Sequence, residues 1–161
     1  MTNFFKNIFL KKSLTSINSI DKDNQVDGGK NSIDELIQTW EHTDLKLNEP
    51  APTELIMDTQ QKLDFTFPDD FINFYKQVNG FKDWDVIGNM FSIWPLERIV
   101  EEYEQSLDKD FIPFCDFLID SHRIGYLRTQ SGTYKNIDLT KVADTFEETI
   151  QLIIENSRLL Y

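Results

Sequence analysis

The stretch from residue 67 to residue 80, FPDDFINFYKQVNG, constrains the fold more than any other part of the chain. Pro68 fixes its own φ and disfavours a helical residue before it, so an extended segment must end there. Asp69 and Asp70 put negative charge in a first helical turn, where the helix dipole favours it. Asn79-Gly80 tolerates the left-handed conformation that ends helices. The residues between have the i, i+3, i+4, i+7 spacing of a buried stripe: Phe71, Phe74, Tyr75 and Val78.

The length and the aromatic content indicate a chain that can build a hydrophobic core. Its 161 residues correspond to one domain, with room for an appendage. A chain of this length buries about two thirds of its unfolded surface, and 13 Phe, 5 Tyr and 3 Trp provide large apolar side chains for the interior. The single cysteine, Cys115, excludes an internal disulfide framework, so we expect a reducing compartment and a cytoplasmic location.

The charge of the chain bears on the class of partner. The formal net charge is −12, which leaves no basic field to neutralise phosphates and disfavours direct nucleic-acid binding. Residues 1–30 contain five Lys and three Asp, a net charge of +2, so the remaining 131 residues carry −14. An acidic domain suits a basic partner, because charge complementarity speeds their encounter. The alternative is that the acidity only keeps the protein soluble.

The N-terminal 30 residues differ in composition from the rest. Residues 1–14, MTNFFKNIFLKKSL, are basic and amphipathic, but Lys6 interrupts the apolar run and no cleavage site of a signal peptide follows. This segment suits a helix at a membrane surface; the alternative is a short helix docked on the domain, or simply a frayed end. Residues 18–31 are polar and contain Gly28-Gly29, as in a linker. We therefore predict an amphipathic segment with a linker over residues 1–30 and a globular domain over residues 31–161.

Four further helices are predicted from their caps and apolar stripes. Ser32 and Glu35 have the spacing of a capping box. Pro95 is expected at the first position of a later helix, and Asp144 with Glu147 at the start of the last one. The fourth helix is expected over residues 53–63. In chain order, the buried positions of the four helices are expected to be Ile33, Leu36, Ile37 and Trp40; Leu55, Ile56, Thr59 and Leu63; Leu96, Ile99, Val100 and Tyr103; and Phe146, Ile150, Ile153 and Ile154.

Strands are predicted over residues 91–94 and through the region that begins at residue 111. Pro113 lies in the strand expected over residues 111–114 and favours an edge or a terminus, because proline cannot donate to a ladder. Residues 117–120 form a second apolar run in this β region. A hairpin turn is expected at Ser131-Gly132, between the runs 124–130 and 133–137.

The chain lacks the residue patterns that several catalytic sites need. No GxxxxGK or GxGxxG loop occurs, and Cys115, His42 and His122 are too few for a structural zinc site. Asp120-Ser121-His122 contains triad residue types, but neighbours on a strand point to opposite faces. We expect a polar strand or turn role for His122 and an inert buried thiol at Cys115. The prediction is a non-enzyme without metal or cofactor; the alternative is an unrecognised hydrolase with His122 as its base.

Two segments are candidate contacts for a protein partner. The loop over residues 81–89 carries Trp84 between Asp83 and Asp85, and Trp is favoured at interface hot spots. The alternative for Trp84 is a lid folded back on the core. The helix after Pro95 has a charged face with the densest acidic patch in the chain, Glu97, Glu101, Glu102 and Glu104, with Arg98 among them. Most such faces are merely solvated, which is the alternative here.

Several motifs, taken in order, resemble the SUKH superfamily, the Smi/Knr family. The first is Trp40 in the leading helix. The second is Leu63, followed by Phe67-Pro68-x-Asp70-Phe71 and then by Asn79-Gly80. The last two are the strand-to-helix step Ile93-Trp94-Pro95-Leu96 and the start of the last helix, Val142-Ala143-Asp144-Thr145-Phe146-Glu147-Glu148. The resemblance runs from about residue 33 to residue 156. Phe67 stands where the family usually has Leu, and residues 1–30 lie outside the resemblance.

The resemblance implies a fold and a class of function. The fold is a SUKH-like α+β domain, with a twisted, largely antiparallel sheet and helices packed around it. The family includes yeast cell-wall regulators and many bacterial immunity proteins that bind and neutralise a secreted toxin, often a nuclease. The expected partner is therefore a basic cognate toxin, and the contacts are expected at Asp83, Trp84, Asp85, Glu97, Glu101, Glu102 and Glu104. The alternative is an intracellular scaffold or regulator of the yeast type.

Overall fold

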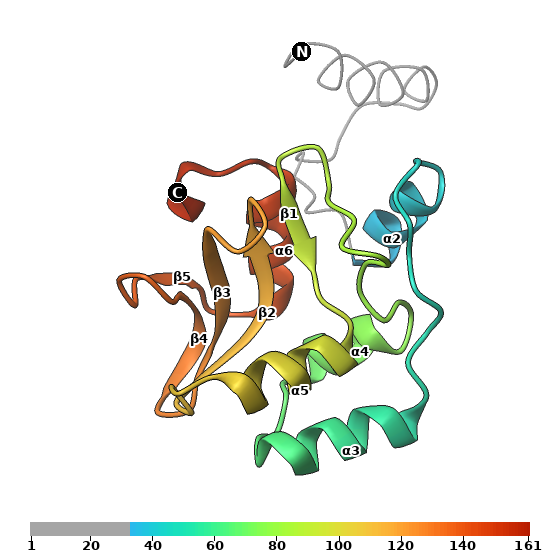
Figure 1. Ribbon diagram of the computed structural model, residues 1–161. Helices are drawn as coiled ribbons and strands as arrows, with labels where there is room; N and C mark the ends of the chain where they lie inside the picture. Colours follow the sequence, from blue (N-terminus) through green and yellow to red (C-terminus); the bar gives the residue numbers. More distant parts are fainter. Residues whose placement is uncertain (1–32) are drawn as a thin grey trace, which may run out of the picture. The chain divides into compact units, whose positions relative to one another are not determined.

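The computed structural model describes residues 33–161 (Figure 1). The predictions for the amphipathic segment, the linker and Ser32 lie outside these residues. The helices of the described part are α2 (Ile33–Glu41), α3 (Thr53–Leu63), α4 (Asp69–Tyr75), α5 (Leu96–Gln105), α6 (Phe146–Ile154) and the 3₁₀-helix η1 (Arg158–Leu160). The strands are β1 (Phe91–Ile93), β2 (Phe111–Phe117), β3 (His122–Leu127), β4 (Gln130–Lys135) and β5 (Lys141–Ala143).

The five strands form one antiparallel sheet in the order β1-β2-β3-β4-β5, so that every strand pairs with its neighbour in the chain. Short connections suffice for such a meander, whereas parallel pairs need long crossovers. Helix α6 packs against β4 and β5 and lies behind the sheet in Figure 1, while α5 packs against β2 and α3. The predicted α+β fold is confirmed.

The FPDDF helix, α4, supplies the centre of the core. Its stripe residues Phe71, Phe74 and Tyr75 are fully buried. The Phe71 ring stacks on Phe67 at 4.0 Å between centroids and meets Phe146 of α6 edge-on at 5.0 Å. Aromatic pairs in these geometries add about 0.5–1.5 kcal/mol each to the free energy gained by burial. The predicted buried stripe is confirmed, Val78 included.

The end of α4 differs from the prediction, because the helix stops at Tyr75, one turn before Asn79-Gly80. Gly80 has a φ of +64°, and a Cβ there would lie 2.5 Å from the Trp94 carbonyl. The Asn79 side chain accepts a hydrogen bond from the backbone N–H of Leu96 at 2.9 Å. Asn79 and Gly80 therefore contact the start of α5 and do not end α4. Pro95 is the N-cap residue of α5 rather than its first helical residue, and Asn79 provides the acceptor that the proline side chain lacks.

Pro113 lies inside β2, an interior strand, so the prediction of an edge or a terminus was wrong. Strand β2 pairs with β1 on one side and with β3 on the other. The register of β2 against β3 shifts between Pro113 and Cys115, and such a bulge accommodates a residue that cannot donate. Gly125 is paired with Pro113, and a Cβ on it would lie 2.3 Å from the Ile112 carbonyl oxygen.

Two predictions for the β region are wrong about where the chain turns. The hairpin between β3 and β4 exists, but it turns at Arg128-Thr129; Ser131-Gly132 lies within β4 as an irregularity, with a φ of +98° at Gly132. In the apolar run over residues 117–120 only Phe117 belongs to a strand. Leu118, Ile119 and Asp120 have φ values of 48°, 51° and 70° and form the turn into β3. Asp116 holds this turn, because its carboxylate accepts the Asp120 N–H at 2.7 Å.

The N-cap of α6 is Thr145, not Asp144. The Thr145 hydroxyl accepts the N–H of Glu148 at 3.1 Å, and the Glu148 carboxylate accepts the N–H of Asp144 at 3.2 Å. The capping pair is therefore shifted by one residue from the prediction. The buried face of α6 is confirmed for Phe146, Ile150 and Ile153.

Candidate partner-binding surface

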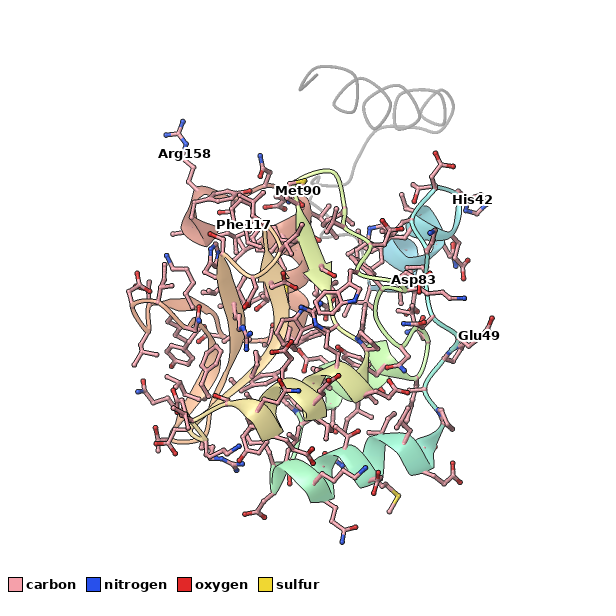
Figure 2. The ribbon with its side chains drawn as sticks, in the orientation of Figure 1. His42, Glu49, Asp83, Met90, Phe117 and Arg158 are labelled. Atoms are coloured by element: carbon pink, nitrogen blue, oxygen red, sulfur yellow. The ribbon has the colours of Figure 1, made fainter. Side chains whose placement is uncertain are left out.

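Trp84 lies at the surface on the loop between α4 and β1, where Figure 2 labels its neighbour Asp83. Its side chain is 63% exposed, so it does not cover the core as a lid. Asp83 and Trp84 have φ values of 53° and 63°, in the left-handed region that non-glycine residues rarely adopt. Such conformations persist where the surroundings impose them and are enriched at functional sites.

The Trp84 ring rests on the guanidinium of Arg98 from α5. The Arg98 guanidinium carbon lies 3.6 Å from the centroid of Trp84 and 3.9 Å from the centroid of Trp94, so the cation is in contact with both rings. Trp94 is fully buried and follows β1 directly. A cation–π contact contributes about 0.5–1 kcal/mol at an exposed site and about 2 kcal/mol where it is desolvated, so the contact with the buried Trp94 is the stronger of the two. The contact therefore fixes an exposed anchor side chain on the rigid part of the fold.

Arg98 is itself nearly buried and depends on a carboxylate of β2. Its Nη2 lies 3.3 Å from Asp116 Oδ1, and its Nε lies 3.8 Å from Glu102 Oε1, within ion-pair range but too far for a hydrogen bond. Trp94 Nε1 also donates to Asp116. Burial lowers the pKa of Arg98 from its usual value, and Asp116 and Glu102 oppose that shift. A buried charge needs such partners, because an unpaired one is costly to remove from water.

A second arginine extends this cluster to the turn between β2 and β3. Arg123 lies opposite Asp116 in the β2–β3 register, and its Nη2 lies 2.9 Å from Glu102 Oε2. Its guanidinium also donates to both oxygens of Asp120. The hydrogen bond to Asp120 raises the pKa of Arg123, and the same contact holds the pKa of Asp120 below its usual value. We call Trp84, Trp94, Arg98, Glu102, Asp116, Asp120 and Arg123 the arginine cluster.

The predicted contact residues have different surroundings in the structure. Asp85 accepts the backbone N–H of Lys46 at 2.8 Å and so holds its own loop, and Glu97 accepts the side-chain amide of Asn79 at 2.9 Å. Glu102 is turned toward Arg98 and Arg123, which neutralise it. Asp83, Glu97, Glu101 and Glu104 are exposed. The acidic face is therefore divided into a part that is paired within the protein and a part that is exposed.

Sequence reasoning placed only Trp84 and Glu102 of the arginine cluster among the contact residues, and Trp94 was predicted only as part of a strand. Arg98 was expected on the exposed face of its helix, and Asp116, Asp120 and Arg123 were not considered as contacts. The i, i+4 spacing of Arg98 and Glu102 was the one local signal of pairing. The rest follows from the sheet register, in which Ser92, Asp116 and Arg123 occupy adjoining positions on one face.

Asp120, Ser121 and His122 do not form a relay, because Asp120 binds Arg123. His122 is 6% exposed at the start of β3, in contact with the rings of Phe91 and Phe117. Burial lowers its pKa. Cys115 is fully buried, and burial raises the pKa of its thiol well above the usual value, as expected for an inert thiol.

Residues 33–161 contain no group of three or more His, Cys, Asp and Glu side chains placed to hold a metal ion. Within the same residues, no helix has both the length and the apolar character that crossing a membrane requires.

The comparison with protein families supplies the remaining evidence. The family model described as SMI1/KNR4 family (SUKH-1) matches residues 50–152, which is more than half of the chain. The match contains the FPDDF helix, the loop with Trp84, helix α5 and all five strands. Comparison with curated proteins finds no match.

Proposed function

Because the chain belongs to the SMI1/KNR4 family (SUKH-1), we propose that it is a non-enzymatic cytoplasmic protein that binds a basic protein toxin and neutralises it. Binding requires no cofactor. The observation that carries the proposal is the exposed Trp84, held on Arg98 beside an acidic helix face. A preordered aromatic anchor loses little conformational entropy on binding.

The charge of the protein supports the class of partner. The net charge is −12, and Asp83, Glu97, Glu101 and Glu104 lie exposed around the Trp84 loop and along α5. Nuclease toxins are a fitting partner class, because enzymes that bind phosphates present basic surfaces that an acidic inhibitor can occupy. In this model the outward carboxylates steer the encounter, and Trp84 contributes to the lifetime of the complex.

The first experiment is capture of partners from the source cell with the full chain as bait, washed at low and then at high salt. We expect one basic protein that is toxic when expressed alone and harmless when co-expressed with this chain. Several weakly held partners, none of them toxic, would instead indicate a scaffold or regulator and would contradict the toxin proposal.

Charge reversal then tests the surface itself. Glu101→Lys with Glu104→Lys should slow association with the captured partner and weaken its salt dependence, because rim charges act mainly on the association rate. The matched control is Glu41→Lys with Glu155→Lys, which changes the net charge equally at the ends of α2 and α6, where the helix dipole favours a cation. Equal effects of the two pairs would mean that only net charge matters and would remove the α5 face from the interface.

A further inference from the structure

Apolar side chains are exposed together at one end of the sheet. This end holds the start of β1, the turn between β2 and β3 and the turn between β4 and β5, because successive strands run in opposite directions. The Tyr161 ring also lies there, 5.0 Å from the ring of Phe117 between centroids. Single exposed apolar residues are ordinary, whereas a group of them marks an interaction surface. This end carries six of the ten large apolar side chains that are exposed within residues 33–161: Met90, Leu118, Ile119, Ile137, Leu139 and Tyr161.

The turn between β2 and β3, residues 118–121, is the most informative part of this end. Leu118, Ile119 and Asp120 have successive φ values of 48°, 51° and 70°. Non-glycine residues rarely adopt this left-handed region, and it is least favourable for a β-branched residue such as Ile119. The side chains of Leu118 and Ile119 are 47% and 76% exposed, so burial within residues 33–161 does little to offset the strain. Strain that packing does not explain indicates that the turn has a function.

Hydrogen bonds to neighbouring segments impose this conformation on the turn. The Leu118 N–H donates to the carbonyl of Met90 at 3.0 Å, which ties the turn to the start of β1. Figure 2 labels Met90 and Phe117 at this end of the sheet. On the other side of the turn, the Asp116 carboxylate accepts the Asp120 N–H at 2.7 Å. The two apolar side chains are thus presented on a fixed backbone, which lowers the entropic cost of binding.

The Asp116 carboxylate also connects the turn to the exposed Trp84. Its Oδ2 accepts the Asp120 N–H, and its Oδ1 lies 3.3 Å from Arg98 Nη2. The Arg98 guanidinium carbon in turn lies 3.6 Å from the centroid of the Trp84 ring. A protein–protein interface of standard size covers roughly 800 Å² on each partner, about 30 Å across, which is wide enough for one interface to include both Trp84 and the turn.

Charge favours a protein partner over the other possible occupants of this end of the sheet. A second copy of the chain would bring together two net charges of −12, and an anionic membrane surface would repel the chain for the same reason. A basic protein is attracted instead. The occupant that fits is therefore the same basic partner that meets Trp84 in the proposed function.

We propose that the turn between β2 and β3 inserts Leu118 and Ile119 into an apolar pocket of the basic protein partner, as a second anchor in addition to Trp84. This inference rests on the proposed function, because it assigns the turn to that same partner. In the complex the two side chains are removed from water, and their burial stabilises the bound state. The strained turn thus lowers the stability of the free chain and strengthens the complex.

Ile119→Asn tests the turn, because asparagine tolerates the left-handed region and removes the apolar side chain without a change of charge. We expect the melting temperature of the full chain to rise by about 3 °C and the affinity for the captured partner to fall at least about tenfold. A merely structural residue would move both quantities in the same direction. A fall in both would therefore assign Ile119 a structural role and overturn the proposal, as would an unchanged affinity.

The matched control is Leu107→Asn, at an exposed leucine that has no positive φ. Leu107 precedes β2, whereas the turn follows that strand, so the two positions lie toward opposite ends of β2. Leu107→Asn should change neither the melting temperature nor the affinity. An equal loss of affinity in both variants would mean that any exposed apolar residue contributes, and would overturn the assignment to the turn.

Binding kinetics separate the turn from the acidic face of α5. Ile119→Asn should raise the dissociation rate about tenfold and leave the salt dependence of association unchanged, because an apolar anchor acts after the encounter. Charge reversal at Glu101 and Glu104 acts on association instead. An effect of Ile119→Asn confined to the association rate would overturn the proposal.

The other possible occupants are tested with the full chain alone. If light scattering shows a dimer that Ile119→Asn separates into monomers, a second copy covers the turn and the proposal is overturned. If the chain binds phosphatidylcholine vesicles and Ile119→Asn abolishes that binding, the turn meets lipid and the proposal is likewise overturned.

The captured partner distinguishes this inference from the proposed function. If binding falls with Trp84→Ala but not with Ile119→Asn, the turn lies outside the interface and the proposed function stands. If no captured protein is toxic but Ile119→Asn still weakens the binding of a basic one, the turn remains a protein contact and the proposed function fails.

Discussion

The guanidinium carbon of Arg98 lies 3.6 Å from the centroid of the Trp84 ring, so the one exposed tryptophan of the chain rests on a nearly buried cation. This contact joins the loop before β1 to helix α5. It also makes the exposed anchor depend on buried groups of β2, because Asp116 holds Arg98 from below. Changes in the arginine cluster should therefore affect both stability and partner binding.

Replacement of Arg98 tests the cluster directly. Arg98→Met should lower the free energy of unfolding by about 3 kcal/mol, because it leaves the Asp116 carboxylate buried without its cation. Urea unfolding followed by circular dichroism measures the change. Arg158→Met, at an exposed arginine on η1, should stay within about 0.5 kcal/mol of the wild type. Similar losses in the two variants would show that the pairing with Asp116 contributes little.

Asn79 gives a second stability prediction, because its amide oxygen caps α5 from outside that helix. Asn79→Ala should lower the free energy of unfolding by about 1–2 kcal/mol, since the Leu96 N–H and Glu97 both lose a partner. Thermal and urea unfolding check this value. Asn73→Ala, at an exposed position of α4, is the control and should change stability little. No loss in Asn79→Ala would contradict its role as a cap.

The turn between β2 and β3 predicts a stabilising substitution. Ile119 is 76% exposed with a φ of 51°, an unfavourable conformation for a β-branched residue. Ile119→Gly should raise the free energy of unfolding by about 1 kcal/mol, because glycine relieves this strain and little burial is lost. Ile137→Gly should lower it instead, since Ile137 is also exposed but has no positive φ. The same sign in both variants would contradict the strain argument.

We predict that the buried His122 makes the stability of the protein depend on pH. Burial, with a smaller contribution from Lys135, lowers its pKa in the folded protein; Leu160, Asp138 and Asp116 oppose the shift. His122 takes up a proton near pH 6.5 in the unfolded chain, while in the folded protein its side chain stays neutral at that pH. Stability should therefore be full above about pH 6.5 and fall as the pH drops toward the lowered pKa.

His122→Gln should flatten the slope of unfolding free energy between roughly pH 7 and pH 5, measured by urea unfolding at a series of pH values. The control is His42→Gln, the same substitution at the exposed histidine of the described residues. The depressed pKa of Asp120 adds stability that is lost only below its usual range, as the pH falls through its folded pKa. A slope unchanged by His122→Gln would assign the pH dependence to other groups.

The candidate site shows how far local sequence reasoning extends. The exposed Trp84 and the exposed members of the α5 face were among the contacts predicted, because loop composition and helical spacing are local properties. The pairing of Glu102 with Arg98 and Arg123 was not predicted, because it depends on which strand lies beside α5.

What the amino-acid sequence determined by itself was the set of elements with strong local signals. The stripe from Phe71 to Val78, the breaks at Pro68 and Pro95 and the strand β1 all depend on residues within two helical turns or one strand. Only the tertiary structure decided where long-range hydrogen bonds and ion pairs form: Asn79 caps α5, Asp116 lies under Arg98, and a bulge accommodates Pro113 in an interior strand. These contacts join residues far apart in the chain, whose meeting depends on sheet order and register, and no local spacing encodes them.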